Sequence, residues 1–188
     1  MGVSGRLHAV WVFARACDRK SLFEIAEHDL AVRVRAQAVR AIADLCDPIF
    51  VEHKIEAGRG DPEIAKRLTM LCRDQEPRIL LEVTSALGRL RWSQAPGWLK
   101  ENIGTPDPTL AHAAMQTMRR SRNWPAVLEW LDAPNDSPLR LIVLRALGEQ
   151  ADVEVVDGLL HLLENSRAPA WRREYAELLS RVYRKPGP

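Results

Sequence analysis

A period of about thirty residues runs through this 188-residue sequence and constrains its fold more than any other feature. Four prolines, each followed by an apolar segment, are spaced 31, 30 and 31 residues apart: Pro77, Pro108, Pro138 and Pro169. Proline suits the first turn of a helix, because its φ angle is already fixed and its missing N–H would have no partner there. A fixed period of this length is typical of arrays of helical repeats.

The segment Val32–Cys46 is the clearest copy of the repeated helix. Its apolar residues Val34, Ala38, Ala41, Ile42 and Leu45 recur at i, i+4, i+7, i+8 and i+11, which predicts an amphipathic helix with one buried stripe. Similar segments recur along the chain. The residues in the place of Ala41 are Val12, Ala86, Thr117, Ala146 and Leu178, and successive positions are 29 to 32 residues apart except for one gap of 45.

The wide gap contains an insertion at residues 47–60. Ile49, Phe50, Val51 and Ile55 favour a short helix there, and Gly58 begins a loop. Because the entropic cost of a loop grows slowly with its length, we expect this segment to project from the edge of the array and to be dispensable for folding.

A second apolar segment follows each repeated helix, which completes a helix pair. We therefore predict an all-α fold, a right-handed α-α superhelix of about eleven helices in five to six repeats, with no sheet. Residues 1–188 are predicted to form one domain. The first helix, residues 5–17, is apolar almost all round, so we expect further chain before residue 5, or a second copy, to cover it. We interpret the sequence as a piece of a larger protein.

The chain resembles the HEAT-repeat family. The resemblance is carried by the turns 74–77, 105–108 and 135–138 and by the pattern Val34-Arg35-x-x-Ala38, and it implies an armadillo-like α-α solenoid. The tetratricopeptide alternative lacks its Trp-Leu-Gly-Tyr pattern. Residues 5–11 and the Val-Arg copies also resemble the HEAT segment of bacterial, planctomycete-type, membrane-bound, haem-binding dehydrogenase-like proteins. That resemblance implies a segment joining a propeller to a cytochrome module, although no Cys-x-x-Cys-His occurs here.

Charge is divided between the two kinds of helix. The six first helices, taken as 5–17, 32–46, 77–92, 106–122, 138–150 and 169–185, hold 18 basic and 6 acidic residues, and the rest of the chain holds 9 and 19. In HEAT arrays second helices line the concave side, so the resemblance implies an acidic concave face that repels nucleic acid and favours a basic or apolar protein segment. The candidate partner-binding residues are Trp98, Trp130, Glu129 and Asp157, because tryptophan is enriched at binding hot spots. Packing in the core is the alternative for the two tryptophans, and the sequence leaves both interpretations open.

The alternative function is nucleic-acid binding, as in the HEAT-like alkylpurine DNA glycosylases. Its candidate residues are Arg119, Arg120 and Arg122, a basic cluster in a chain that also holds tryptophans. A solvated helix face with Arg–Asp bridges explains these arginines equally, and we favour that explanation. The net charge of +2 gives no overall field that selects nucleic acid. No apolar run approaches the ~20 residues that cross a bilayer, so we expect no membrane contact.

The remaining candidates for chemistry are weak. Cys17, Cys46 and Cys72 lie near helix ends without a Cys-x-x-Cys motif, and we expect buried, unpaired thiols. Glu27-His28 and Glu52-His53 resemble the iron-binding His-Glu pairs of the HEAT-like deoxyhypusine hydroxylases. Those enzymes use four pairs, whereas this chain has two pairs in the reverse order, so we expect ordinary surface residues. We therefore predict a non-enzymatic scaffold with no catalytic residue, metal or cofactor, which mediates interactions with proteins or neighbouring domains. The sequence leaves localisation open.

Overall fold

The computed structural model describes residues 1–72, 76–132, 137–148 and 150–182. These residues form twelve α-helices and two short 3-10 helices without a strand, which confirms the all-α class. The count exceeds the predicted eleven by one helix, because the apolar part of the insertion is helical. The chain divides into two compact units, Met1–Ala95 and Pro96–Pro188. Within the described segments, no helix combines the length and the apolar character needed to span a membrane.

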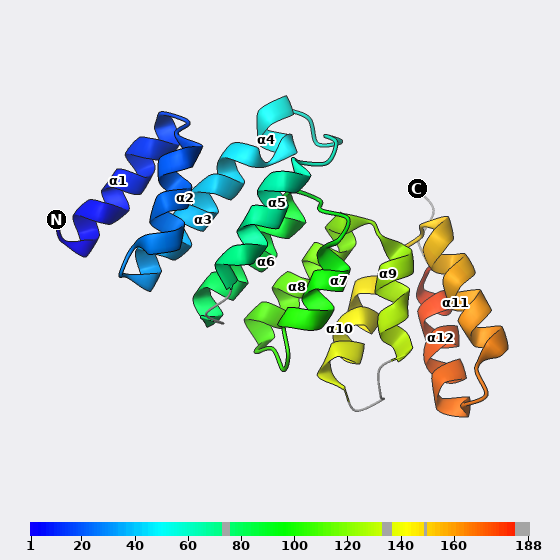
Figure 1. The fold of residues 1–188 in the computed structure, drawn as a ribbon. Coiled ribbons are helices and arrows are strands. Elements are labelled where there is room, and N and C mark those ends of the chain that lie inside the picture. Colours follow the sequence, from blue (N-terminus) through cyan, green and yellow to red (C-terminus); the bar gives the residue numbers. More distant parts are fainter. Residues whose placement is uncertain (73–75, 133–136, 149, 183–188) are drawn as a thin grey trace. The chain divides into compact units, whose positions relative to one another are not determined.

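In the first unit, α3 is the central helix. It packs against α1, α2 and α6, and α5 packs against α6 (Figure 1). The helices of this unit are α1 (Val3–Arg15), α2 (Arg19–His28), α3 (Val32–Cys46), α4 (Pro48–Glu52), α5 (Pro62–Thr69), the 3-10 helix η1 (Met70–Cys72) and α6 (Pro77–Arg89).

The predicted apolar stripe of α3 forms the core of the first unit. Val34, Ala38, Ala41 and Ile42 each expose 1% or less of their surface, whereas Leu45 is half-buried. The small alanine side chains let neighbouring helices approach α3 on several sides, so α1, α2 and α6 can all pack against it.

The repeat register holds in five of its six positions. Ala86, Thr117, Ala146 and Leu178 are buried like Ala41, but Val12 is 53% exposed. The prediction was wrong for α1, where Val10 is the buried residue. Because α1 is apolar on nearly every side, its periodicity could not identify the inward face.

Proline is the first residue of six of the twelve described α-helices, and aspartate provides several of the caps. Asp107 accepts hydrogen bonds from the backbone N–H groups of Thr109 and Leu110, both at 2.8 Å, before α8. Asp61 accepts from Glu63 at 2.9 Å before α5. These carboxylates satisfy N–H groups that have no partner inside the helix. α-Helices start at Pro48, Pro62, Pro77, Pro108, Pro138 and Pro169.

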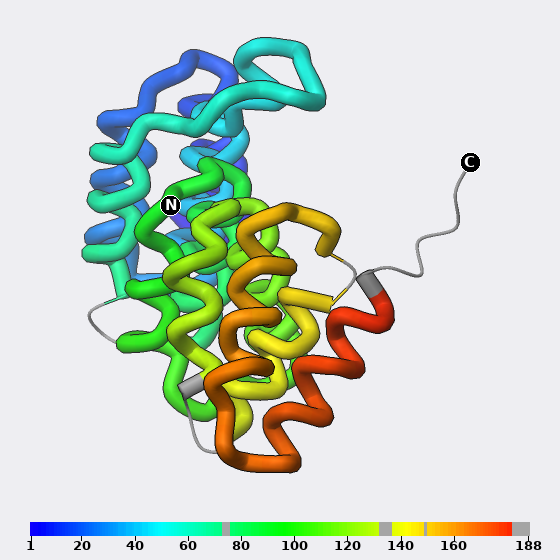
Figure 2. Tube along the Cα trace, turned by 90° about the vertical axis from the view of Figure 1, so that its right-hand side faces the viewer, coloured from blue at the N-terminus to red at the C-terminus, as the bar shows by residue number. Residues whose placement is uncertain are grey.

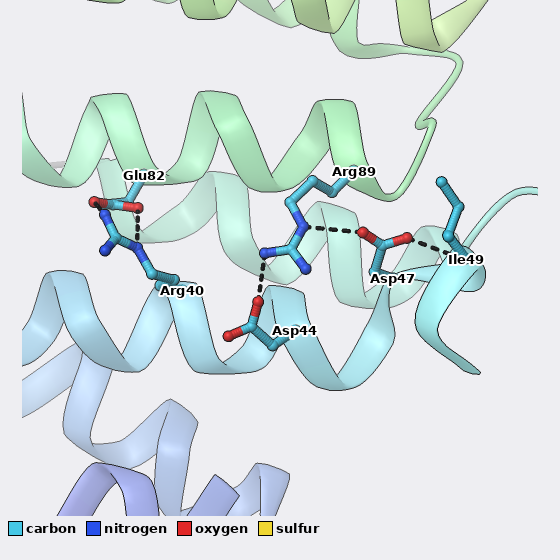
Figure 3. Close-up of polar contacts among 6 residues, drawn as sticks. All are labelled: Arg40, Asp44, Asp47, Ile49, Glu82 and Arg89. Carbon is cyan, nitrogen blue, oxygen red and sulfur yellow. Dashed lines mark hydrogen bonds and ion pairs between the residues drawn. The ribbon is translucent and has the colours of Figure 1, made fainter. Parts of the chain in front are cut away.

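Ion pairs connect α3 to α6 (Figure 3). Arg89 on α6 donates to Asp44 at 2.6 Å and to Asp47 at 3.0 Å, and Arg40 on α3 pairs with Glu82 on α6. Burial alone would lower the pKa of Arg89, but the hydrogen bonds to the two aspartates outweigh it and raise that pKa. Some arginines of the first helices are thus engaged in bridges between helices.

The insertion is fastened to the end of α6. Arg91 donates to the carbonyl oxygens of Ala57 and Ile55, the latter at 2.9 Å, and the N–H of Gly60 donates to the carbonyl of Leu90 at 2.9 Å. Ala57 is buried at this junction, whereas Ile55 is 85% exposed. Phe50 and Val51 on α4 are also more than half exposed. Phe50, Val51 and Ile55 therefore do not fill a core.

The second unit pairs its helices in the same way. α8 packs against α10, α9 against α11, and α11 against α12, which is red in Figure 2 (Figures 1 and 2). Its helices are α7 (Ala95–Asn102, which begins one residue before the unit), α8 (Pro108–Ser121), α9 (Trp124–Leu128), the 3-10 helix η2 (Glu129–Asp132), α10 (Pro138–Leu147), α11 (Val153–Asn165) and α12 (Pro169–Val182).

A buried arginine joins three elements of the second unit. The side chain of Arg140 on α10 is 1% exposed and donates to Glu174 on α12 at 2.7 Å and to the carbonyl of Leu131 on η2. Its guanidinium also lies 4.6 Å from the ring centroid of Trp171. Burial lowers the pKa of Arg140, but hydrogen bonds to Tyr175 and Glu174 outweigh it and raise that pKa.

Candidate protein-interaction surface

The two predicted tryptophan anchors occupy different environments. Trp130 on η2 is 1% exposed and belongs to the core of the second unit. Its indole Nε1 is buried and has no hydrogen-bond partner in the described part of the chain. Trp98 on α7 is half-buried. Trp98 therefore stays a candidate contact, whereas Trp130 is not accessible to a partner in this structure.

The two predicted acidic residues both lie on the surface of the second unit. Asp157 is exposed on α11, and Glu129 is exposed at the start of η2, directly after α9, which packs against α11. Asp157 is not alone on its side of the helix. Glu154, Leu160, His161 and Glu164 follow the same exposed side at helical spacing. We call this set, with Asp157, the α11 acidic face.

Among the described residues, no cationic side chain pairs with the acidic residues of this region. Within the residues that the structure describes, no ion pair involves Glu129, Glu154, Asp157 or Glu164. Glu154 lies in the first turn of α11, where a negative charge is favourable. Glu164 lies in the last turn, where the helix dipole disfavours it, and like charges three or four residues apart repel. The face therefore carries a negative potential that a cationic partner would relieve.

The same side of α11 also carries exposed apolar residues. Val153 at the start of α11 is 73% exposed, and Leu160 is 39% exposed. On the opposite side of the helix, Val155 and Leu159 are fully buried. The outward side of α11 thus offers carboxylates together with aliphatic contacts, which is the chemistry that a basic, amphipathic protein segment requires.

The basic cluster of the alternative function is only partly available. Arg119 caps the end of α10, because it donates to the carbonyl oxygens of Ala146 at 3.0 Å, Arg145 at 2.7 Å and Gly148 at 2.9 Å. These carbonyls have no partner within the helix. Arg120 and Arg122 are exposed at the end of α8. A nucleic-acid site would therefore depend on these two arginines.

The cysteines differ from the prediction in one case. Cys72 is buried and Cys46 is half-buried, but Cys17 is exposed. The prediction of burial was wrong for Cys17, because it follows the last turn of α1 in a left-handed conformation with φ of 54°. Burial raises the pKa of the Cys72 thiol to about 12. In the described residues, no group of three or more His, Cys, Asp or Glu side chains could hold a metal ion.

Sequence reasoning named Asp157 but missed the rest of the α11 acidic face. The signal was present, since Glu154, Asp157, His161 and Glu164 follow a spacing of three, four and three residues.

A comparison with protein-family models and with curated proteins finds no match to this sequence.

Proposed function

We propose that this chain is a non-enzymatic scaffold built from HEAT-type helical repeats and that it forms part of a larger multidomain protein. In this proposal the α11 acidic face binds a basic segment of a partner protein or of a neighbouring domain. The observation that carries the proposal is the set of exposed carboxylates on α11 without cationic partners among the described residues, bordered by Val153 and Leu160. Trp98 is proposed as a further contact.

Electrostatics favours a protein over a nucleic acid at this face. Glu154, Asp157 and Glu164 would repel phosphate, which supplies most of the affinity in nucleic-acid binding. A segment rich in lysine and leucine instead gains both charge pairing and apolar burial. Arg119 of the basic cluster already donates to three carbonyl oxygens. The nucleic-acid alternative therefore has only Arg120 and Arg122 of that cluster available to contact phosphate.

The proposal is tested by titrating the chain into a fluorescent peptide of helically spaced lysine and leucine and, separately, into a labelled DNA duplex. The test variant neutralises the face with Glu154→Gln, Asp157→Asn and Glu164→Gln. Exposed ion pairs contribute about 0.2–1 kcal/mol each, so three lost pairs should weaken peptide binding about tenfold.

The matched control removes the same charge from exposed carboxylates of the first unit, with Glu24→Gln, Glu56→Gln and Glu63→Gln. The proposal expects this control to bind the peptide like the wild type. Equal weakening by both triple variants would show that only the net charge matters. Salt-sensitive DNA binding that disappears with Arg120→Ala and Arg122→Ala, without peptide binding, would establish the alternative function.

A further inference from the structure

A second surface of the same unit has the opposite character. A hollow of about 380 Å³ lies between α8, α10 and α12, and its apolar lining comes from Met115, Leu141, Leu144 and Leu178. Leu141 is 55% exposed, which leaves an aliphatic side chain on the outer side of α10 at the mouth of the hollow. We call this hollow the α10–α12 groove. Its volume falls within the range of pockets that hold ligands.

Arginine side chains supply the positive charge of the groove. Arg119, Arg145 and Arg181 line it, one from each of the three helices. Arg119 is held in place by its bonds to the end of α10. Arg145 and Arg181 are exposed, and neither forms an ion pair with another described residue.

The acidic residues of the groove are already compensated. Glu174 lines the groove but is bonded to Arg140 at 2.7 Å, and Glu177 is paired with Arg173 at 3.5 Å. Arg140 and Arg173 are not part of the lining. Among the described residues, the charges of the groove that remain without a counterion are therefore positive, so they attract an anion rather than a cation.

We infer that the α10–α12 groove docks an acidic amphipathic segment of a partner protein. An aliphatic side chain of that segment enters the hollow between Leu141, Leu144 and Leu178, and flanking carboxylates pair with Arg145 and Arg181. A nucleic-acid phosphate matches the arginines but offers no aliphatic group for the hollow. Charge complementarity and the exposed leucine together select an acidic peptide.

This docking site is separate from the α11 acidic face and does not depend on it. A unit with an acidic surface and a basic, apolar groove can hold two segments of opposite charge at once. Such a unit would link two partners, or two parts of one larger chain, rather than bind a single one.

The test uses a fluorescein-labelled peptide of glutamate and leucine at helical spacing, titrated with the full chain. Two parallel peptides carry glutamine for glutamate or alanine for leucine. The test variant is Arg145→Glu with Arg181→Glu, and the matched control is Arg120→Glu with Arg172→Glu, two exposed arginines outside the groove. Leu141→Gln provides a second test at an exposed position, where a change does not threaten folding.

The inference predicts that the test variant and Leu141→Gln each weaken binding of the acidic peptide about tenfold or more, while the control variant binds like the wild type. Both altered peptides should bind more weakly. Neutralising the α11 acidic face should leave this binding unchanged, so the two proposals fail independently. Equal loss of peptide binding in the test and control variants would overturn the inference. Concentration-dependent self-association that Arg145→Glu abolishes would also overturn it, since a second copy of the chain would then occupy the groove.

Discussion

Replacing Arg140 with methionine should cost the second unit about 3 kcal/mol of stability. The substitution keeps much of the apolar volume but removes the guanidinium that joins α10 to η2 and α12. The side chain is 1% exposed, and the carbonyl of the buried Leu131 that it leaves behind is poorly placed to recover its bond from water. Breaking a buried ion pair at one partner typically costs about 3–5 kcal/mol.

The contacts of Arg140 place the expected cost at the lower end of that range. The carbonyl oxygen of Leu131, a buried residue, loses a donor, which costs about 1–3 kcal/mol. Loss of the cation–π contact at 4.6 Å from Trp171 adds about 0.5–1 kcal/mol. Glu174 is 35% exposed and can be partly hydrated, so its loss of the ion pair adds less than a fully buried carboxylate would.

The assay is urea unfolding followed by tryptophan fluorescence and by circular dichroism. Arg173→Met is the matched control, because Arg173 pairs with Glu177 at 3.5 Å on the surface and both side chains are more than half exposed. We expect the control to change the free energy of unfolding by less than about 0.5 kcal/mol. A stability for Arg140→Met equal to or above the wild type would refute the reasoning, since it would mean that desolvation of the charge outweighs its bonds.

Four further outcomes follow from the first unit. Gly60→Ala should loosen the insertion and cost about 1–3 kcal/mol in a thermal melt, because a Cβ atom at Gly60 would lie 2.7 Å from the side chain of Leu90 and 3.3 Å from its Cα; an unchanged midpoint would contradict this. Ile55→Ser should change stability by less than about 0.5 kcal/mol in the same melt, since Ile55 is 85% exposed. Iodoacetamide at mildly alkaline pH should alkylate the exposed Cys17 much faster than Cys72, as followed by mass spectrometry. Equal alkylation rates would be inconsistent with the burial of Cys72. Because the folded pKa of Cys72 is raised from 9.0 to about 12, only the unfolded chain loses this proton within that interval, so stability should decrease as the pH rises through it.

The sequence predicted the helices well where a local signal was strong. At residues 32–46 the apolar period marked the segment, and α3 spans Val32–Cys46. At Pro77 and Pro108 the proline fixed the helix start, and the buried stripes of α6 and α8 followed from it. Backbone geometry and amphipathic spacing are local properties, so a single sequence reveals them.

The second helices were harder to orient. Trp130 lies 13 residues past its repeat position, and this count was compatible both with an outward side chain beside Trp98 and with packing in the core. In the structure α9 ends at Leu128 and continues as the 3-10 helix η2, which changes the direction of the following side chains. A change of helix type within one segment leaves no clear mark in the apolar period, so the sequence alone could not decide between burial of Trp130 in the core and its exposure to a partner.

The α10–α12 groove could not be predicted from the sequence. Leu141 and Leu178 are ordinary apolar residues of amphipathic helices, and only the spacing of α8, α10 and α12 leaves a hollow between them. The α11 acidic face, in contrast, could be predicted from the sequence. Once Val155 and Leu159 are taken as the buried side of α11, helical spacing places the carboxylates on the opposite, exposed side.

The most direct test of the proposed function is photo-crosslinking from the α11 acidic face. In the test variant, a photoreactive benzophenone residue replaces Leu160, which is 39% exposed on that face. In the control variant, the same residue replaces Ile55 in the first unit. Both are irradiated with an extract of the source cells, and the adducts are identified by mass spectrometry. We predict an adduct with a defined basic segment of a protein, formed only from the Leu160 position and lost when Glu154, Asp157 and Glu164 are neutralised. Adducts with nucleic acid, or the same protein adducts from both positions, would contradict the account.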